Sequence, residues 1–125
     1  MNLSVNTMTP FIEDLIEKTK SNQYIWDSMG KDSYCLVAGG YSYAIKSQSG
    51  FIPSANDSQL TFQFFDKKSC IFEYSPTFFT NNEKFSQLVI QLMEVVSAQY
   101  AEALREKAQN AMNALNNKKI KNHEY

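Results

Sequence analysis

A run of apolar residues at helical spacing, from Thr80 to Lys118, constrains this chain more than any other feature. Its apolar side chains recur three or four residues apart, so they share one stripe of a helix. The stripe contains Phe85, Leu88, Val89, Leu92, Met93, Val96, Tyr100 and Leu104, and it continues through Ala108, Ala111 and Leu115. Thr80 and Glu83 have the spacing of a capping box, which predicts that the helix begins there.

Such a helix is too long for one small domain. At about 1.5 Å per residue it would reach roughly 55 Å, whereas a compact chain of this size has a radius of gyration of about 14 Å. The stripe also changes from bulky to small residues after Leu104. We therefore expect residues 105–125 to project from the domain, to fray, or to pack on another chain.

The N-terminal part predicts a second, shorter helix. Residues 1–8 are polar and unpatterned, so we expect a loose segment there. Thr9 and Pro10 suit the N-cap and the first helical position. Apolar residues at helical spacing then continue to a helix end near Ser21, and residues 29–32 have the composition of a turn.

Two hairpins follow in the pattern. The pair Gly39-Gly40 favours a two-residue turn within residues 33–47. This register places apolar residues opposite one another, in the pairs Ala38–Tyr41, Leu36–Tyr43 and Tyr34–Ile45.

For residues 59–75, a two-residue loop would set Phe62 opposite Glu73, whereas a three-residue loop at 66–68 keeps one face apolar. We therefore expect the three-residue loop. It gives the pairs Leu60–Tyr74, Phe62–Phe72 and Phe64–Cys70.

These elements predict an α+β fold in one domain, residues 1–125. An N-terminal helix and a long C-terminal helix pack on the same face of a four-stranded antiparallel sheet made of two hairpins. The order of the strands does not follow from these arguments.

Composition argues against several functions. The net charge is −1 and the isoelectric point is about 5.8, so nucleic acid is a poor partner for the chain. Cys35 and Cys70 match no metal or redox spacing, and the single histidine, His123, lies near the end. We expect no metal, no cofactor and no enzymatic activity. No signal peptide or membrane span is recognisable, so we expect a cytoplasmic protein without a membrane partner.

The sequence therefore favours a non-enzymatic interaction protein, such as an adaptor, an inhibitor or an antitoxin-like partner of the kind that mobile elements encode. We expect it to contact a protein partner and to form a two-fold homodimer. The candidate interface comprises Leu104, Ala108, Ala111 and Leu115 on the long helix and Val37, Phe65 and Ile71 on the open face of the sheet.

The alternative is a small-ligand-binding protein or a minor enzyme. Its pocket would lie between the sheet and the helices, lined by Tyr34, Tyr43, Phe62, Phe72 and Tyr74. A cavity of at least about 300 Å³ under the sheet would favour this alternative.

Overall fold

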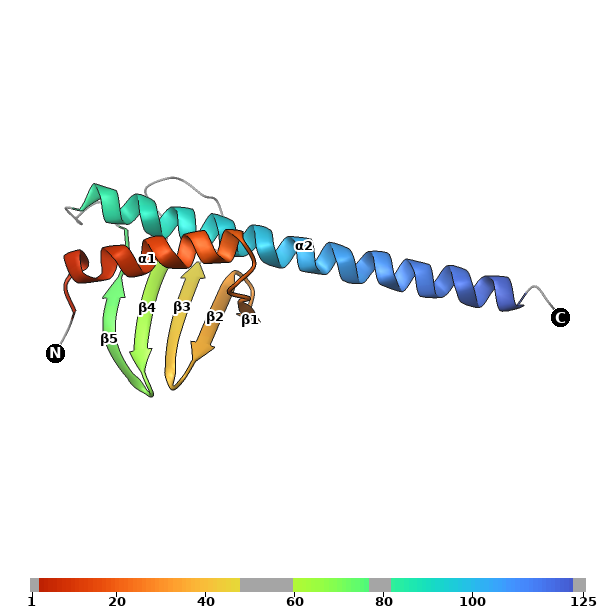
Figure 1. The fold of residues 1–125 in the computed structure, drawn as a ribbon, viewed down its shortest axis with the longest axis horizontal. Coiled ribbons are helices and arrows are strands. Elements are labelled where there is room, and N and C mark those ends of the chain that lie inside the picture. Colours follow the sequence, from red (N-terminus) through yellow and green to blue (C-terminus); the bar gives the residue numbers. More distant parts are fainter. Residues whose placement is uncertain (1–2, 48–59, 77–81, 123–125) are drawn as a thin grey trace.

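The computed structural model describes residues 3–47, 60–76 and 82–122, with side chains as far as residue 118. The elements are α1 (Val5–Lys20), β1 (Asp27–Gly30), β2 (Ser33–Ala38), β3 (Tyr41–Ser47), β4 (Leu60–Asp66), β5 (Ser69–Tyr74) and α2 (Glu83–Asn122). The α+β prediction is confirmed. The strands form one antiparallel meander in the order β1-β2-β3-β4-β5. Both helices cover the same face of the sheet and run side by side in the same direction (Figure 1).

The sheet has five strands rather than the predicted four. Part of the segment assigned to a turn belongs to β1, which pairs Asp27 with Cys35 and Ser28 with Tyr34. All four residues of β1 are exposed. A strand that buries no side chain carries no alternating apolar pattern, and its backbone pairing leaves no signal in the sequence.

The first helix begins earlier than predicted. Ser4 is its N-cap, and the Ser4 hydroxyl accepts a hydrogen bond from the Thr7 amide at 3.1 Å. Residues 3–8 are therefore not loose, since Met8 is fully buried and the Leu3 amide donates to the Ile71 carbonyl at 3.0 Å. Pro10 lies inside the helix, and burial of Met8 compensates for the backbone hydrogen bond that proline cannot make.

The predicted register of the first hairpin is confirmed in all three pairs. Gly39 and Gly40 have φ values of 59° and 88°. Two successive positive values are those of a type I′ turn, whose twist matches that of the flanking strands.

The predicted register of the second hairpin is wrong. The loop contains two residues, with Asp66 paired with Ser69 and Phe65 with Cys70. An irregularity between Phe64 and Phe65 then places an extra residue in β5, so that Phe64 pairs with Phe72 and Phe62 with Tyr74. The apolar face is preserved by a bulge instead of a longer loop. Cys70, predicted on the helix-covered face, is exposed as a result.

The core lies between the sheet and the two helices. Its fully buried side chains include Met8, Ile12, Ile45, Phe62, Phe85, Val89, Leu92 and Val96. Phe85 packs edge-on against Phe72 and Tyr74, with ring centroids 5.6 and 4.7 Å apart. The Asn82 side chain accepts a hydrogen bond from the Phe85 amide at 2.9 Å and so caps the first turn of α2. The predicted cap, Thr80, lies outside the described residues.

Candidate interaction surfaces

The long helix leaves the domain at a polar clamp made by Gln99. Its side-chain carbonyl accepts a hydrogen bond from the Trp26 amide at 3.0 Å. Its amide group donates to the Tyr24 carbonyl at 2.8 Å, to the Thr19 carbonyl at 3.3 Å and to the Asn22 side chain at 3.2 Å. Gln99 therefore fixes the connection between α1 and β1 onto α2.

Beyond this clamp, α2 projects away from the sheet (Figure 1). We call residues 101–118 the arm. Every side chain of the arm is exposed, and at the usual helical rise the arm is about 27 Å long. Leu104, Met112 and Leu115 are 46%, 60% and 59% exposed. The arm is thus a single helix whose large apolar side chains have no packing partner within the described chain.

The candidate residues of the long helix do lie together on the arm. Leu104, Ala108, Ala111 and Leu115 follow one another at spacings of four, three and four residues, which places them on one stripe. Met112 lies beside the stripe, and the sequence prediction left it out.

Charge on the arm is segregated around this stripe. At 3.6 residues per turn, Arg105 and Lys107 flank the stripe on its two sides. Glu102 and Glu106 lie on the opposite side of the helix, where Glu102 pairs with Arg105.

The candidate residues of the open sheet face are less well gathered. Val37 and Phe65 are both paired with Ser42, so the three side chains form one row across β2, β3 and β4. The neighbouring row contains Gln63, whose amide donates to the Glu73 carboxylate at 2.6 Å. Polar groups therefore interrupt this face, and of its three candidate residues Val37 is 66% exposed whereas Phe65 and Ile71 are half-buried.

Most of the proposed pocket aromatics belong to the core. Tyr34, Phe62, Phe72 and Tyr74 are all at most 7% exposed. The Tyr74 hydroxyl is within hydrogen-bonding distance of Ser86 Oγ, at 2.7 Å, and donates to the Asn82 carbonyl at 3.0 Å. These four rings are therefore part of the packed hydrophobic core.

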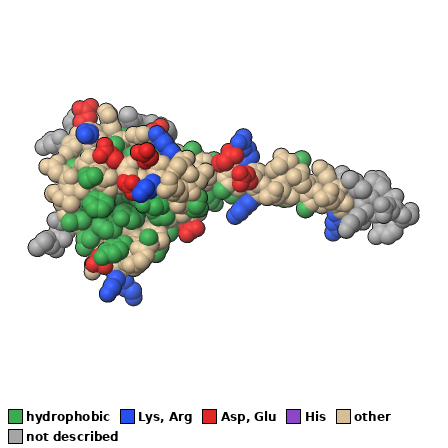
Figure 2. Space-filling view, viewed as in Figure 1, with side chains coloured by type: hydrophobic (Ala, Val, Ile, Leu, Met, Phe, Trp, Pro, Cys, Tyr) green, Lys and Arg blue, Asp and Glu red, His purple; other side chains and the backbone are tan. Residues whose placement is uncertain are grey.

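The fifth aromatic, Tyr43, lines a groove of about 470 Å³ between α1, the segment after it, and β2. Figure 2 shows hydrophobic side chains gathered on the sheet beside α1. Tyr43 stacks on Phe64 with ring centroids 4.7 Å apart, and Tyr41 lies 5.9 Å from the same ring. Burial raises the pKa of the Tyr43 phenol, and the nearby Tyr24 and Asp14 raise it further.

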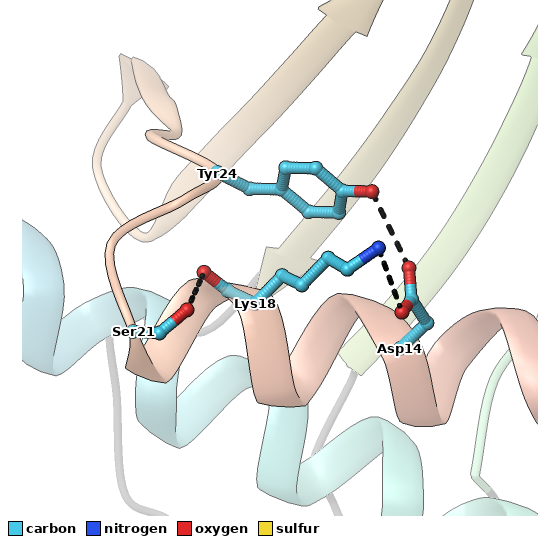
Figure 3. A network of polar contacts seen from close by, with 4 residues as sticks. All are labelled: Asp14, Lys18, Ser21 and Tyr24. Carbon is cyan, nitrogen blue, oxygen red and sulfur yellow. Dashed lines mark hydrogen bonds and ion pairs between the residues drawn. The ribbon is translucent and has the colours of Figure 1, made fainter.

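A small polar network borders this groove (Figure 3). The Asp14 carboxylate pairs with Lys18 at 3.2 Å and accepts a hydrogen bond from the Tyr24 hydroxyl at 3.3 Å. The Lys18 ammonium also lies over the Tyr24 ring, 5.5 Å from its centroid. The single carboxylate of the groove is therefore engaged by two partners from this chain.

Residues 3–47, 60–76 and 82–122 contain no cluster of three or more His, Cys, Asp or Glu residues suited to a metal ion. No helix within these ranges is long and apolar enough to cross a membrane. Cys35 and Cys70 are free thiols, and His123 lies outside the described residues.

Comparison of the chain with family models, with curated proteins and with solved structures found no match.

Proposed function

We propose that this protein is a non-enzymatic interaction protein, an adaptor or inhibitor that acts through its arm. The observation that carries the proposal is the apolar stripe of a projecting helix whose side chains are all exposed. A helical extension of four to five turns is marginal in water when nothing packs on it. A partner that covers Leu104, Met112 and Leu115 would supply the missing burial.

The occupant that we favour is a second copy of the arm in antiparallel orientation. The stripe is symmetric about a point between Ala108 and Ala111, so an antiparallel pair sets Leu104 against the partner's Leu115 at both ends. The alanines in the middle allow the helices to approach closely. Opposed helix dipoles favour this orientation.

The charged residues that flank the stripe do not repel one another in this antiparallel pair. Arg105 would lie beside the partner's Met112, and Lys107 beside the partner's Ala114, so that no two cations meet across the pair. The stripe is short, and we expect less than the roughly 1,200 Å² that stable complexes bury. The proposal is therefore a weak, reversible homodimer.

Light scattering across a concentration series tests the homodimer through which the arm is proposed to act. The full chain should approach twice its monomer mass with a dissociation constant between about 1 μM and 1 mM. The double variant Leu104→Asp/Leu115→Asp and a chain that ends at residue 104 should remain monomeric. The matched control Asn110→Asp/Asn113→Asp adds the same charge on the opposite side of the arm and should dimerise like the parent. A parent that stays monomeric throughout, or a control that loses the dimer as fully as the stripe variant, would contradict the proposal.

The groove beside Tyr43 favours a second candidate, a binding module. We also propose a cytoplasmic location, which suits the free thiols of Cys35 and Cys70.

A further inference from the structure

The edge of the sheet at β2 is only half covered. β1 pairs with residues 33–35 of β2, and no described strand pairs with residues 36–38 on the side away from β3. Ala38 and Tyr41 close the two-residue turn, and such a closing pair exchanges hydrogen bonds. Because successive residues of a strand direct their backbone N–H and C=O groups toward opposite edges, the Val37 N–H and C=O point away from β3. Val37 therefore presents one backbone donor and one backbone acceptor at the edge.

The edge is uncovered because the chain turns away from it. Residues 23–25 would continue β1 along β2, but Gln99 holds the Tyr24 carbonyl and the Trp26 amide against α2. The groove of about 470 Å³ opens between this segment and residues 36–38. Its walls are Leu15 and Phe11 of α1, Tyr24, and Leu36 and Tyr43 of the sheet.

The groove suits an uncharged, apolar occupant. Its carboxylate, Asp14, is already bound by Lys18 and Tyr24, so it offers no unengaged charge to attract a charged group (Figure 3). Large apolar side chains stand exposed around it, with Phe11 at 51% and Ile25 at 59%. Exposed strand edges are usually protected by lysine, proline or a covering loop. Residues 36–38 are Leu, Val and Ala, which give this edge no such protection among the described residues.

We propose that this site binds an extended peptide segment of a partner protein by strand addition to β2. The bound strand would exchange its own N–H and C=O with those of Val37. Its residue opposite Leu36 or Ala38 would lie on the helix-covered face and place an apolar side chain in the groove. Its residue opposite Val37 would remain on the other face. The ligand is therefore a short neutral strand with apolar residues at alternate positions.

This inference is separate from the proposed function of the arm. The groove lies between α1 and β2, and none of its walls belongs to residues 101–118. If the arm does not dimerise, the proposed peptide site is unaffected. If no peptide binds, the proposed dimer of the arm is unaffected.

The test uses a library of short random peptides displayed on phage, selected against the full chain. A selected peptide is then synthesised with a fluorophore and titrated by fluorescence polarisation. Val37→Pro removes the edge donor while leaving the bonds between β2 and β3 in place, because the affected N–H points away from β3. It should weaken binding by at least about tenfold, whereas the control Val37→Thr should bind within about twofold of the parent.

Two further measurements keep the test decisive. Phe11→Ser changes only the helical wall of the groove and leaves the sheet intact. It should weaken peptide binding several-fold, and this test remains available even if Val37→Pro fails to fold. Hydrogen exchange should show the Val37 amide protected only when peptide is present. Three results would each overturn the proposal. The library could show no enrichment, the selected peptides could bind both variants as tightly as the parent, or protection of the Val37 amide could rise with protein concentration in the absence of peptide. The last result would assign the edge to a second copy of the chain.

Discussion

Replacement of Gln99 by alanine should destabilise the whole domain, although the side chain lies at its margin. The Gln99 side-chain oxygen accepts one hydrogen bond, and its NH₂ group has two hydrogens for three acceptors. The four contacts therefore amount to about three full hydrogen bonds. At about 1 kcal/mol each, their loss would cost about 3 kcal/mol. Asn22 is exposed, so in the variant water can replace the hydrogen bond that Asn22 loses and reduce the cost. We expect a decrease of about 2–3 kcal/mol in the free energy of unfolding, and a melting temperature lower by roughly 6–12 °C.

Urea denaturation measures this change, followed in parallel by circular dichroism and by the fluorescence of Trp26. That residue is the single tryptophan, and its indole N–H donates to Thr19 at 2.9 Å close to the clamp. Gln109→Ala is the matched control, because Gln109 is exposed and its side chain donates to the nearby Asn113 at 3.2 Å. The control should lose less than about 0.5 kcal/mol. If Gln99→Ala loses no more than the control, the connection after α1 is held by other contacts and the explanation of the groove fails with it.

Two further changes test the core and the groove wall. Phe62→Ala removes a fully buried ring and should cost about 3–5 kcal/mol in urea denaturation, so a loss under about 1 kcal/mol would show that the sheet face is poorly packed. Burial raises the pKa of Tyr43 in the folded state, and the nearby Tyr24 and Asp14 raise it further. The neutral Tyr43 phenol therefore contributes stability that is fully present below the unfolded pKa near 10 and is lost as the pH rises through the folded pKa. Stability followed from about pH 9 upward should therefore fall less steeply for Tyr43→Phe than for the parent; parallel curves would contradict this reasoning.

The parts of the fold that the sequence predicts are those in which side-chain periodicity coincides with burial. The part of the α2 stripe that carries Phe85, Val89, Leu92 and Val96 is one example, and the sheet face that carries Tyr34, Ile45 and Phe62 is another, because these apolar side chains are buried in the core. Parity correctly placed Leu60, Phe62, Phe72 and Tyr74 on the helix-covered face, but it misplaced Cys70 and attributed the pattern to a longer loop instead of a bulge. An odd loop and a bulge have the same effect on parity, and side-chain pattern cannot separate them.

Other features depend on contacts that no local pattern reveals. The Thr9-Pro10 signal for a helix start is strong locally, but burial of Met8 and the cap at Ser4 extend the helix past it. β1 buries no side chain, and it joins the sheet through backbone pairing with β2. The groove exists because Gln99 binds a segment 73 or more residues earlier in the chain, and a single glutamine in a helix gives no sign of that role.

The order of the strands has a consequence for how the chain folds. Each strand pairs only with its neighbour in sequence, so the sheet can form hairpin by hairpin, with short loops to close except between β3 and β4. The contacts of α1 with α2 join opposite ends of the domain, and the bonds of Gln99 span 73 to 80 residues. Among the hydrogen bonds of the described residues, these have the largest sequence separations and therefore the largest loop-closure entropy. We expect α2 to join last, after the transition state, so that Gln99→Ala accelerates unfolding and leaves the folding rate nearly unchanged.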